Sequence, residues 1–219
     1  MRMQSISVFV AALLVFTGVL SADTPPLALD FTSLGGSANN ASCCSTGGLG
    51  WSLGWSFYTN AAVTVTSLDY WNSPTGLTQS HDVGIYDSNQ NLVVSASVGP
   101  NDPVIPNGAG YGWQEVFVTP VTLAAHQTYY IAGVTGTVDP YAYSVGGLTT
   151  IPQITYLTEQ DFDSGTLVFP ANNTWPGVDP AYFSANFNVP EPPSFVYLFG
   201  YGMMGLAALG LARKKPFRS

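Results

Sequence analysis

The sequence predicts an all-β protein, built as an antiparallel β-sandwich of the jelly-roll kind. Short runs of β-branched and aromatic residues recur between residues 23 and 188, separated by turn-forming Gly, Pro, Asn and Asp. No part of this stretch shows helical periodicity beyond about two turns. Hydrophobic residues make up 46% of the chain and aromatic residues 13%, which is enough to fill a core between two sheets.

The expected strands follow one another closely along the chain. Residues 83–86 and 92–98 flank a polar turn and should form a β-hairpin, because Asp and Asn favour tight turns. A second hairpin is expected from residues 114–123 and 129–134, with His126 exposed in its turn. The remaining expected strands are residues 54–59, 63–66, 68–71, 153–157, 166–169 and 182–187.

Positive charge is confined to the two ends of the chain. The basic residues are Arg2, Arg213, Lys214, Lys215 and Arg218, so residues 23–189 contain no Lys or Arg. Of the 13 acidic residues only Glu191 lies outside that stretch, which leaves it with a charge of 13 − 1 = 12 negative units when its histidines are neutral. A body without cations cannot neutralise phosphates, so nucleic-acid binding is excluded.

The N-terminus has the pattern of a secretory signal peptide over residues 1–22. Arg2 precedes an apolar stretch at residues 6–19, and Ser21 and Ala22 are small residues suited to cleavage. The alternative is an N-terminal anchor helix, although the apolar stretch is short for a membrane span. We therefore expect residues 23–188 to be one exported β-sandwich domain.

The C-terminus, residues 189–219, has three consecutive parts. A motif is followed by the uncharged residues 195–212, long enough to cross most of a membrane, and then by the basic tail at residues 213–218. The basic cluster is expected to stop translocation and stay in the cytoplasm. The motif is Val189-Pro190-Glu191-Pro192, and the stop-transfer cluster is Arg213, Lys214 and Lys215.

This order of motif, apolar segment and basic tail resembles the PEP-CTERM sorting signal of Gram-negative bacteria that secrete exopolysaccharide. The resemblance implies recognition by exosortase, cleavage near Pro190-Glu191-Pro192, and transient anchoring in the inner membrane through the C-terminal helix. It also implies a final place at the envelope surface or in the extracellular matrix. A plain single-span anchor is the alternative.

Part of the body also resembles a β-sandwich domain of unknown function that occurs in secreted bacterial proteins, many of them with this sorting signal. The resemblance covers about residues 50–134 and is carried by residues 54–57, 63–68, 80–87, 120–123 and 128–130. It implies the fold and the compartment, and it brings no activity and no catalytic residue.

The candidate chemical groups in the body are few. Cys43 and Cys44 are adjacent, and in an oxidising compartment they form a vicinal disulfide, remain free thiols or pair with another molecule. His81-Asp82 could suggest catalysis, but no Ser lies in a nucleophile-elbow context, so we expect His81 to cap the loop that enters its strand. We expect no enzymatic activity.

Two groups suggest ligand binding. Glu159, Asp161 and Asp163 alternate before a Gly and could bind calcium, although a solvated acidic loop is the simpler interpretation. Aromatic residues near turns could stack on sugar rings, while those inside strands belong to the core. The expected sugar-stacking residues are Trp71, Tyr111 and Trp175.

The sequence therefore predicts an exported protein with a structural or adhesive role in exopolysaccharide or biofilm, with exosortase as a partner. A carbohydrate-binding module is the first alternative. A jelly-roll glycan hydrolase is the second, and it would need paired carboxylates that face one cleft.

Overall fold

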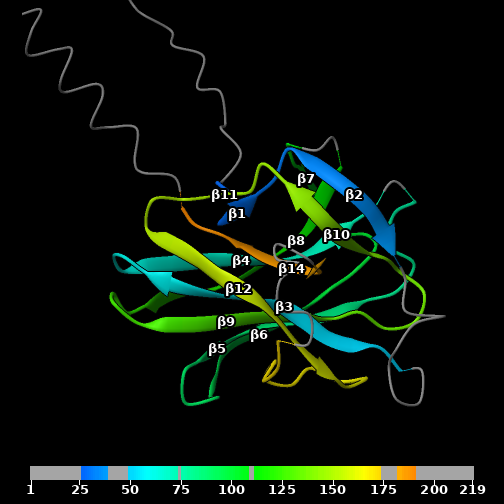
Figure 1. Ribbon diagram of the computed structural model, residues 1–219. Helices are drawn as coiled ribbons and strands as arrows, with labels where there is room; N and C mark the ends of the chain where they lie inside the picture. Colours follow the sequence, from blue (N-terminus) through cyan, green and yellow to red (C-terminus); the bar gives the residue numbers. More distant parts are fainter. Residues whose placement is uncertain (1–25, 39–48, 74, 109–110, 174–181, 191–219) are drawn as a thin grey trace, which may run out of the picture.

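The structure is a computed structural model that describes residues 26–38, 49–73, 75–108, 111–173 and 182–190, and the regular elements in these residues are all β-strands (Figure 1). None of the described residues belongs to a helix that is long and apolar enough to cross a membrane. The strands are β1 Leu29–Asp30, β2 Ser33–Ala38, β3 Trp51–Thr59, β4 Val63–Asn72, β5 His81–Asp87, β6 Leu92–Val98, β7 Val104–Pro106, β8 Gly112–Leu123, β9 Thr128–Val134, β10 Tyr141–Gly146, β11 Thr149–Thr150, β12 Ile154–Asp163, β13 Tyr182–Phe183 and β14 Ala185–Asn188.

Two large antiparallel sheets form a sandwich, which confirms the predicted fold class. The five-stranded sheet has the order β12-β3-β9-β5-β6, and the four-stranded sheet has the order β14-β4-β8-β7. Two small sheets, β13-β10-β2 and β1-β11, lie beyond the four-stranded sheet in Figure 1. The chain passes from β13 to β14 through Ser184 alone, so this segment joins a small sheet to the four-stranded one.

Aromatic side chains fill the space between the two large sheets. Trp55 of β3 stacks on Phe187 of β14 with ring centroids 6.1 Å apart, and Phe57 lies 5.3 Å from the same ring. All three side chains are fully buried. The indole Nε1 of Trp55 donates to the carbonyl of Ala185 at 2.8 Å, so the core satisfies this polar group across the sandwich.

The N-terminal segment covers the other face of the four-stranded sheet. Phe31 packs against Trp71 and Trp113, with centroid separations of 5.3 and 6.1 Å. The carboxamide of Asn186 accepts from the Leu29 amide at 3.3 Å and donates to the Leu29 carbonyl at 2.7 Å. Both faces of this sheet are therefore buried, which explains why nearly all consecutive residues in the second half of β4 are buried.

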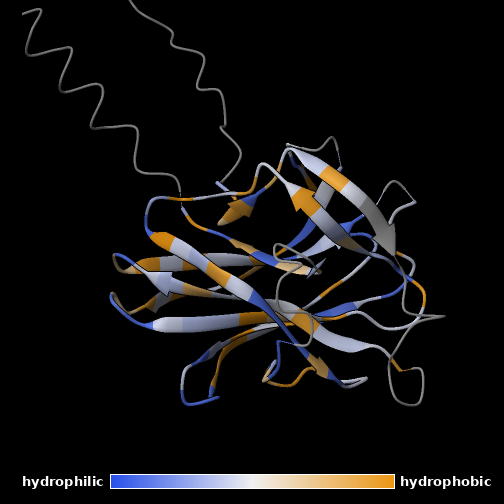
Figure 2. Ribbon diagram, viewed as in Figure 1, coloured by the Kyte–Doolittle hydropathy of each residue, from blue (hydrophilic) through white to orange (hydrophobic). Residues whose placement is uncertain are grey.

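The first predicted hairpin is confirmed. β5 and β6 pair antiparallel, and Asp87 Oδ1 accepts from the amides of Asn89 and Asn91 at 2.8 and 2.9 Å. Gln90 adopts a φ of 68°, a left-handed conformation that such turns require. Figure 2 shows this turn in the hydrophilic colours.

The second predicted hairpin is wrong. β8 pairs with β4 and β7, whereas β9 pairs with β3 and β5 in the opposite sheet. The turn between them crosses the end of the sandwich and is held by Thr59, whose Oγ1 donates to the Ala124 carbonyl at 2.7 Å and accepts from the Gln127 amide at 3.0 Å. His126 is exposed there with a φ of 59°, as expected.

Two further strand assignments differ from expectation. Residues 166–169 do not form a strand, and the segment expected to be an acidic loop after residue 157 belongs to β12, which continues to Asp163. Its pairing with β3 extends through Asp163 and Trp51. The signal peptide, the sorting tail from Glu191 onward, Cys43, Cys44 and Trp175 lie outside the described residues. Of the sorting motif, Val189 is buried and its amide donates to the Pro26 carbonyl at 3.4 Å, and Pro190 is exposed.

Candidate functional site

The structure pairs His81 with Asp139 rather than with its neighbour Asp82. His81 Nε2 lies 2.8 Å from Asp139 Oδ2, and the two side chains are 1% and 2% exposed. Asp82 points outward and is exposed. The expected loop cap is therefore corrected to a buried pair at the start of β5.

Both ring nitrogens of His81 are engaged. Nδ1 lies 2.7 Å from the carbonyl oxygen of Val134, which can only accept a hydrogen bond. Asp139 also accepts hydrogen bonds from the Thr78 hydroxyl at 2.7 Å and from the amides of Thr78 and Gln79, as an ionised carboxylate does. Both ring nitrogens of this buried histidine are therefore occupied by contacts inside the protein.

Trp71 is fully buried, so it cannot stack on a sugar ring. It packs edge-on against Trp113 at 5.3 Å because the N-terminal segment covers this face of the sheet. Tyr111 is half-buried, and its ring lies 5.5 Å from Trp71. The expectation that residues near turns carry the exposed rings fails for Trp71.

The three acids of β12 lie on one face of the strand. Glu159 and Asp161 are fully buried and Asp163 is half-buried, so the expected solvated loop is wrong. Within the described part of the chain, no three His, Cys, Asp or Glu side chains are arranged to hold a metal ion. Calcium binding by these three acids stays a prediction.

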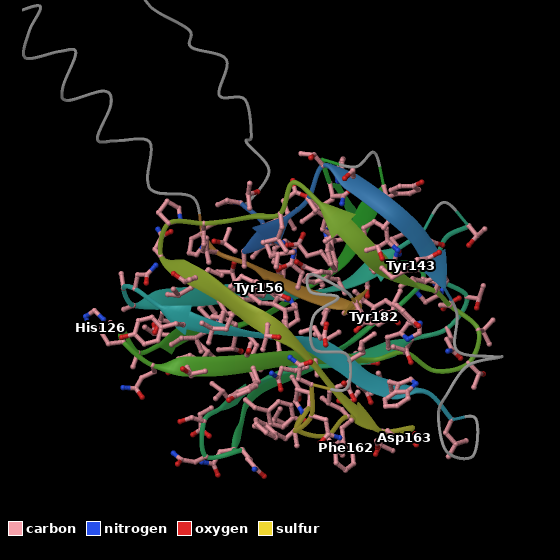
Figure 3. All side chains as sticks on the ribbon, in the orientation of Figure 1. His126, Tyr143, Tyr156, Phe162, Asp163 and Tyr182 are labelled. Atoms are coloured by element: carbon pink, nitrogen blue, oxygen red, sulfur yellow. The ribbon has the colours of Figure 1, made fainter. Side chains whose placement is uncertain are left out.

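Three tyrosines lie close to these acids. Tyr141 and Tyr143 share a face of β10, and Tyr143 is the register partner of Tyr182 on β13. We call Tyr141, Tyr143 and Tyr182 the tyrosine cluster; Figure 3 labels the last two. The rings of Tyr141 and Tyr182 meet edge to face at 5.7 Å.

The tyrosine cluster rests on an apolar base and keeps part of its surface exposed. Trp51 and Leu53 of β3 are buried against Tyr141, and Tyr143 and Tyr182 pack on this group while remaining half-buried. The cluster lies over the end of β3 that also pairs with Asp161 and Asp163. The chain thus brings aromatic rings and carboxylates together from four strands.

The hydroxyls of Tyr141 and Tyr182 stay protonated at neutral pH. Burial raises the pKa of Tyr141 to about 12, with further contributions from Tyr182 and Tyr143. Burial, then Glu159 and Tyr143, raise the pKa of Tyr182. These phenols therefore act as neutral hydrogen-bond donors and acceptors.

Such a surface suits an uncharged, polyhydroxylated ligand. Phenol rings offer apolar faces, and their hydroxyls can exchange hydrogen bonds with other hydroxyls. Acidic ligands are disfavoured because no Lys or Arg occurs in residues 23–189. The sequence signal for this site was the alternation Tyr141-Ala142-Tyr143 after Pro140, which is typical of a strand but does not identify its partner.

Comparisons with known proteins show a family for this chain, and the description of that family names no activity. No curated protein matches the chain. One solved structure, of a family 35 carbohydrate binding module from an environmental isolate, is 20% identical with a TM-score of 0.31 and covers 59% of this chain and 96% of its own. The model of the family described as domain of unknown function DUF4082 matches residues 42–189. The chain belongs to this DUF4082 family.

Proposed function

We propose that this chain is an exported, non-catalytic protein of the cell surface or exopolysaccharide matrix, where its domain has an adhesive role by binding neutral carbohydrate. The observation that carries the proposal is the partly exposed pair Tyr143 and Tyr182 of the tyrosine cluster, on a body free of Lys and Arg. Sugar rings stack on aromatic side chains, and neutral hydroxyls need no countercharge.

The two ends of the sequence support export. The proposal includes a signal peptide at residues 1–22, a membrane-spanning helix at residues 195–212 and exosortase cleavage near Pro190-Glu191-Pro192. The basic cluster that follows residues 195–212 supports this route, since Lys and Arg next to a membrane span stay in the cytoplasm. The jelly-roll connectivity of the strands within this sandwich stays a prediction.

Binding to the neutral fraction of the exopolysaccharide tests the adhesive role. The full chain should be retarded in a native gel that contains this polysaccharide, and Tyr143→Ala with Tyr182→Ala should abolish the retardation. Phe117→Ala is the matched control, because Phe117 is a 67% exposed aromatic residue on β8, away from the cluster. Equal retardation of the double variant and the control would contradict the proposal.

A further inference from the structure

A second group of buried oxygen atoms lies on the four-stranded sheet, apart from the tyrosine cluster. Asp69 of β4 is the register partner of Glu115 of β8, and Ser67 of β4 is the partner of Asn188 of β14. All four side chains are buried, at 0% exposure except for Glu115 at 4%. We call these four residues the carboxylate cluster.

The carboxylate cluster faces away from the five-stranded sheet. Tyr70, the neighbour of Asp69, stacks on His81 of the five-stranded sheet at 3.8 Å. Successive side chains of a strand point to opposite faces, so Asp69 points toward the N-terminal segment. Asn186, the register partner of Asp69, binds Leu29 of that segment on the same face.

Hydrogen-bond acceptors outnumber hydrogen-bond donors in the carboxylate cluster. Asn188 Nδ2 lies 2.9 Å from Glu115 Oε1 and 3.3 Å from Asp69 Oδ1, and the Ser67 hydroxyl lies 3.4 Å from Asp69 Oδ1. Asp69 Oδ2 and Asn188 Oδ1 are buried with no hydrogen-bond partner among the described residues. Such orphaned acceptors cost free energy unless a positive centre satisfies them.

Among the described residues, no basic side chain contacts these carboxylates. Residues 23–189 contain no Lys or Arg, and His81 is engaged with Asp139 and Val134. Asp69 and Glu115 lie directly opposite each other on neighbouring strands, and both side chains are buried. Two adjacent buried carboxylates therefore require either a bound cation or a proton.

We propose that Asp69, Glu115, Asn188 and Ser67 bind one Ca²⁺ ion between β4, β8 and β14. Carboxylate, carboxamide and hydroxyl oxygens are the ligands of this hard cation, which takes about six to eight of them. The carboxamide of Asn188 already contacts both carboxylates, and a half-turn of that amide directs its oxygen at them in place of its nitrogen. The ion uses the orphaned acceptors and neutralises the buried charge.

This site is structural, and it is independent of carbohydrate binding. It links three strands beneath the N-terminal segment, so bound Ca²⁺ stabilises the folded state by mass action. It is also separate from Glu159, Asp161 and Asp163, which lie on β12 at the edge of the other sheet.

Terbium luminescence on the full chain tests the site. Trp71 lies two residues from Asp69, and Trp113 lies two residues from Glu115, on the same face of the sheet. Excitation of these two indoles should therefore sensitise bound Tb³⁺. We expect sensitised emission that Ca²⁺ displaces, and a Ca²⁺-dependent rise of the unfolding temperature of about 5 °C or more at concentrations far above Kd. Both effects should disappear in Glu115→Gln and persist in Asp161→Asn and in the exposed control Asp82→Asn.

Other outcomes overturn the proposal. If Asp161→Asn removes the signal while Glu115→Gln retains it, the ion binds at β12. If Ca²⁺ has no effect on the wild type and Asp69→Asn raises the unfolding temperature at neutral pH, a proton neutralises the cluster. Because Asp69→Asn keeps the shape of the side chain, it also separates loss of binding from loss of folding.

Discussion

His81 Nε2 lies 2.8 Å from Asp139 Oδ2, within hydrogen-bond distance across 58 residues of sequence. The pair fixes the start of β5 to the segment before β10, and Tyr70 stacks on the imidazole at 9° to its plane. The pair therefore links elements that belong to different sheets.

Removing one partner of this pair should destabilise the domain strongly. Asp139→Ala leaves the imidazole and the Thr78 hydroxyl without their acceptor, and breaking a buried pair in this way costs about 3 kcal/mol. Urea unfolding of the full chain measures the loss. Asp82→Ala on the exposed side of the same strand is the control and should change stability by less than about 0.5 kcal/mol. A similar small change in both variants would show that the pair contributes little.

The same pair predicts how stability changes in acid. Burial raises the pKa of Asp139, but hydrogen bonds from His81, Thr78 and Gln79 outweigh it and leave the pKa below its ordinary value. A depressed pKa contributes stability above the unfolded pKa of about 3.9, and this contribution is lost as the pH falls through the folded value. The difference in stability between wild type and Asp139→Asn should be constant above about pH 5 and should narrow below about pH 4. Urea midpoints across this range measure it, and a difference that is independent of pH would contradict the prediction.

Two buried tyrosines should respond differently to the loss of a hydroxyl. Tyr70 Oη is buried without a hydrogen-bond partner among the described residues, so Tyr70→Phe should be neutral or stabilising. The Ala124 amide donates to Tyr129 Oη at 3.0 Å, so Tyr129→Phe should cost about 1 kcal/mol. Thermal unfolding of the two variants side by side checks this order. A larger loss for Tyr70→Phe would mean that its hydroxyl has a partner.

Gly54 is required where β3 lies between β12 and β9. A Cβ at this position would overlap the backbone carbonyl of Ile131 on the neighbouring strand, and backbone cannot move aside as a side chain does. Gly54→Ala should therefore lower stability by more than about 3 kcal/mol, well beyond typical substitutions. Gly99→Ala is the control, because its Cβ would meet only the side chains of Ser80 and Asp102 at 3.2 and 3.7 Å. Circular dichroism with urea unfolding distinguishes the two variants.

The sequence pattern predicted strands better than it predicted their partners. Alternating residues and the Asp87 turn were sufficient for β5 and β6, because this hairpin is held by local contacts. β8 and β9 have the same local signals, yet they enter opposite sheets, since the turn between them is fixed by Thr59 from a distant strand. Local pattern does not contain that contact.

The candidate site was harder to predict for the same reason. Tyr143 and Tyr182 are 39 positions apart in the sequence and are neighbours only because β13 returns to pair with β10. Trp71 has a strand-end position that resembles an exposed one, and only the N-terminal segment with Phe31 makes it core. Burial of aromatic residues depends on long-range packing, so composition alone could suggest a ring-lined surface without locating it.

The last prediction concerns cleavage at the sorting motif. Replacing Pro190, Glu191 and Pro192 with alanine removes the two prolines that keep this segment extended, and it also removes the acid between them. A protease must bind its substrate in an extended form, so the variant should accumulate as a membrane-held precursor in an exopolysaccharide-secreting host. Fractionation and immunoblotting of cells and medium measure the ratio of precursor to released protein. Phe117→Ala in the same host controls for expression and folding, and release of the alanine variant at the wild-type rate would contradict exosortase processing.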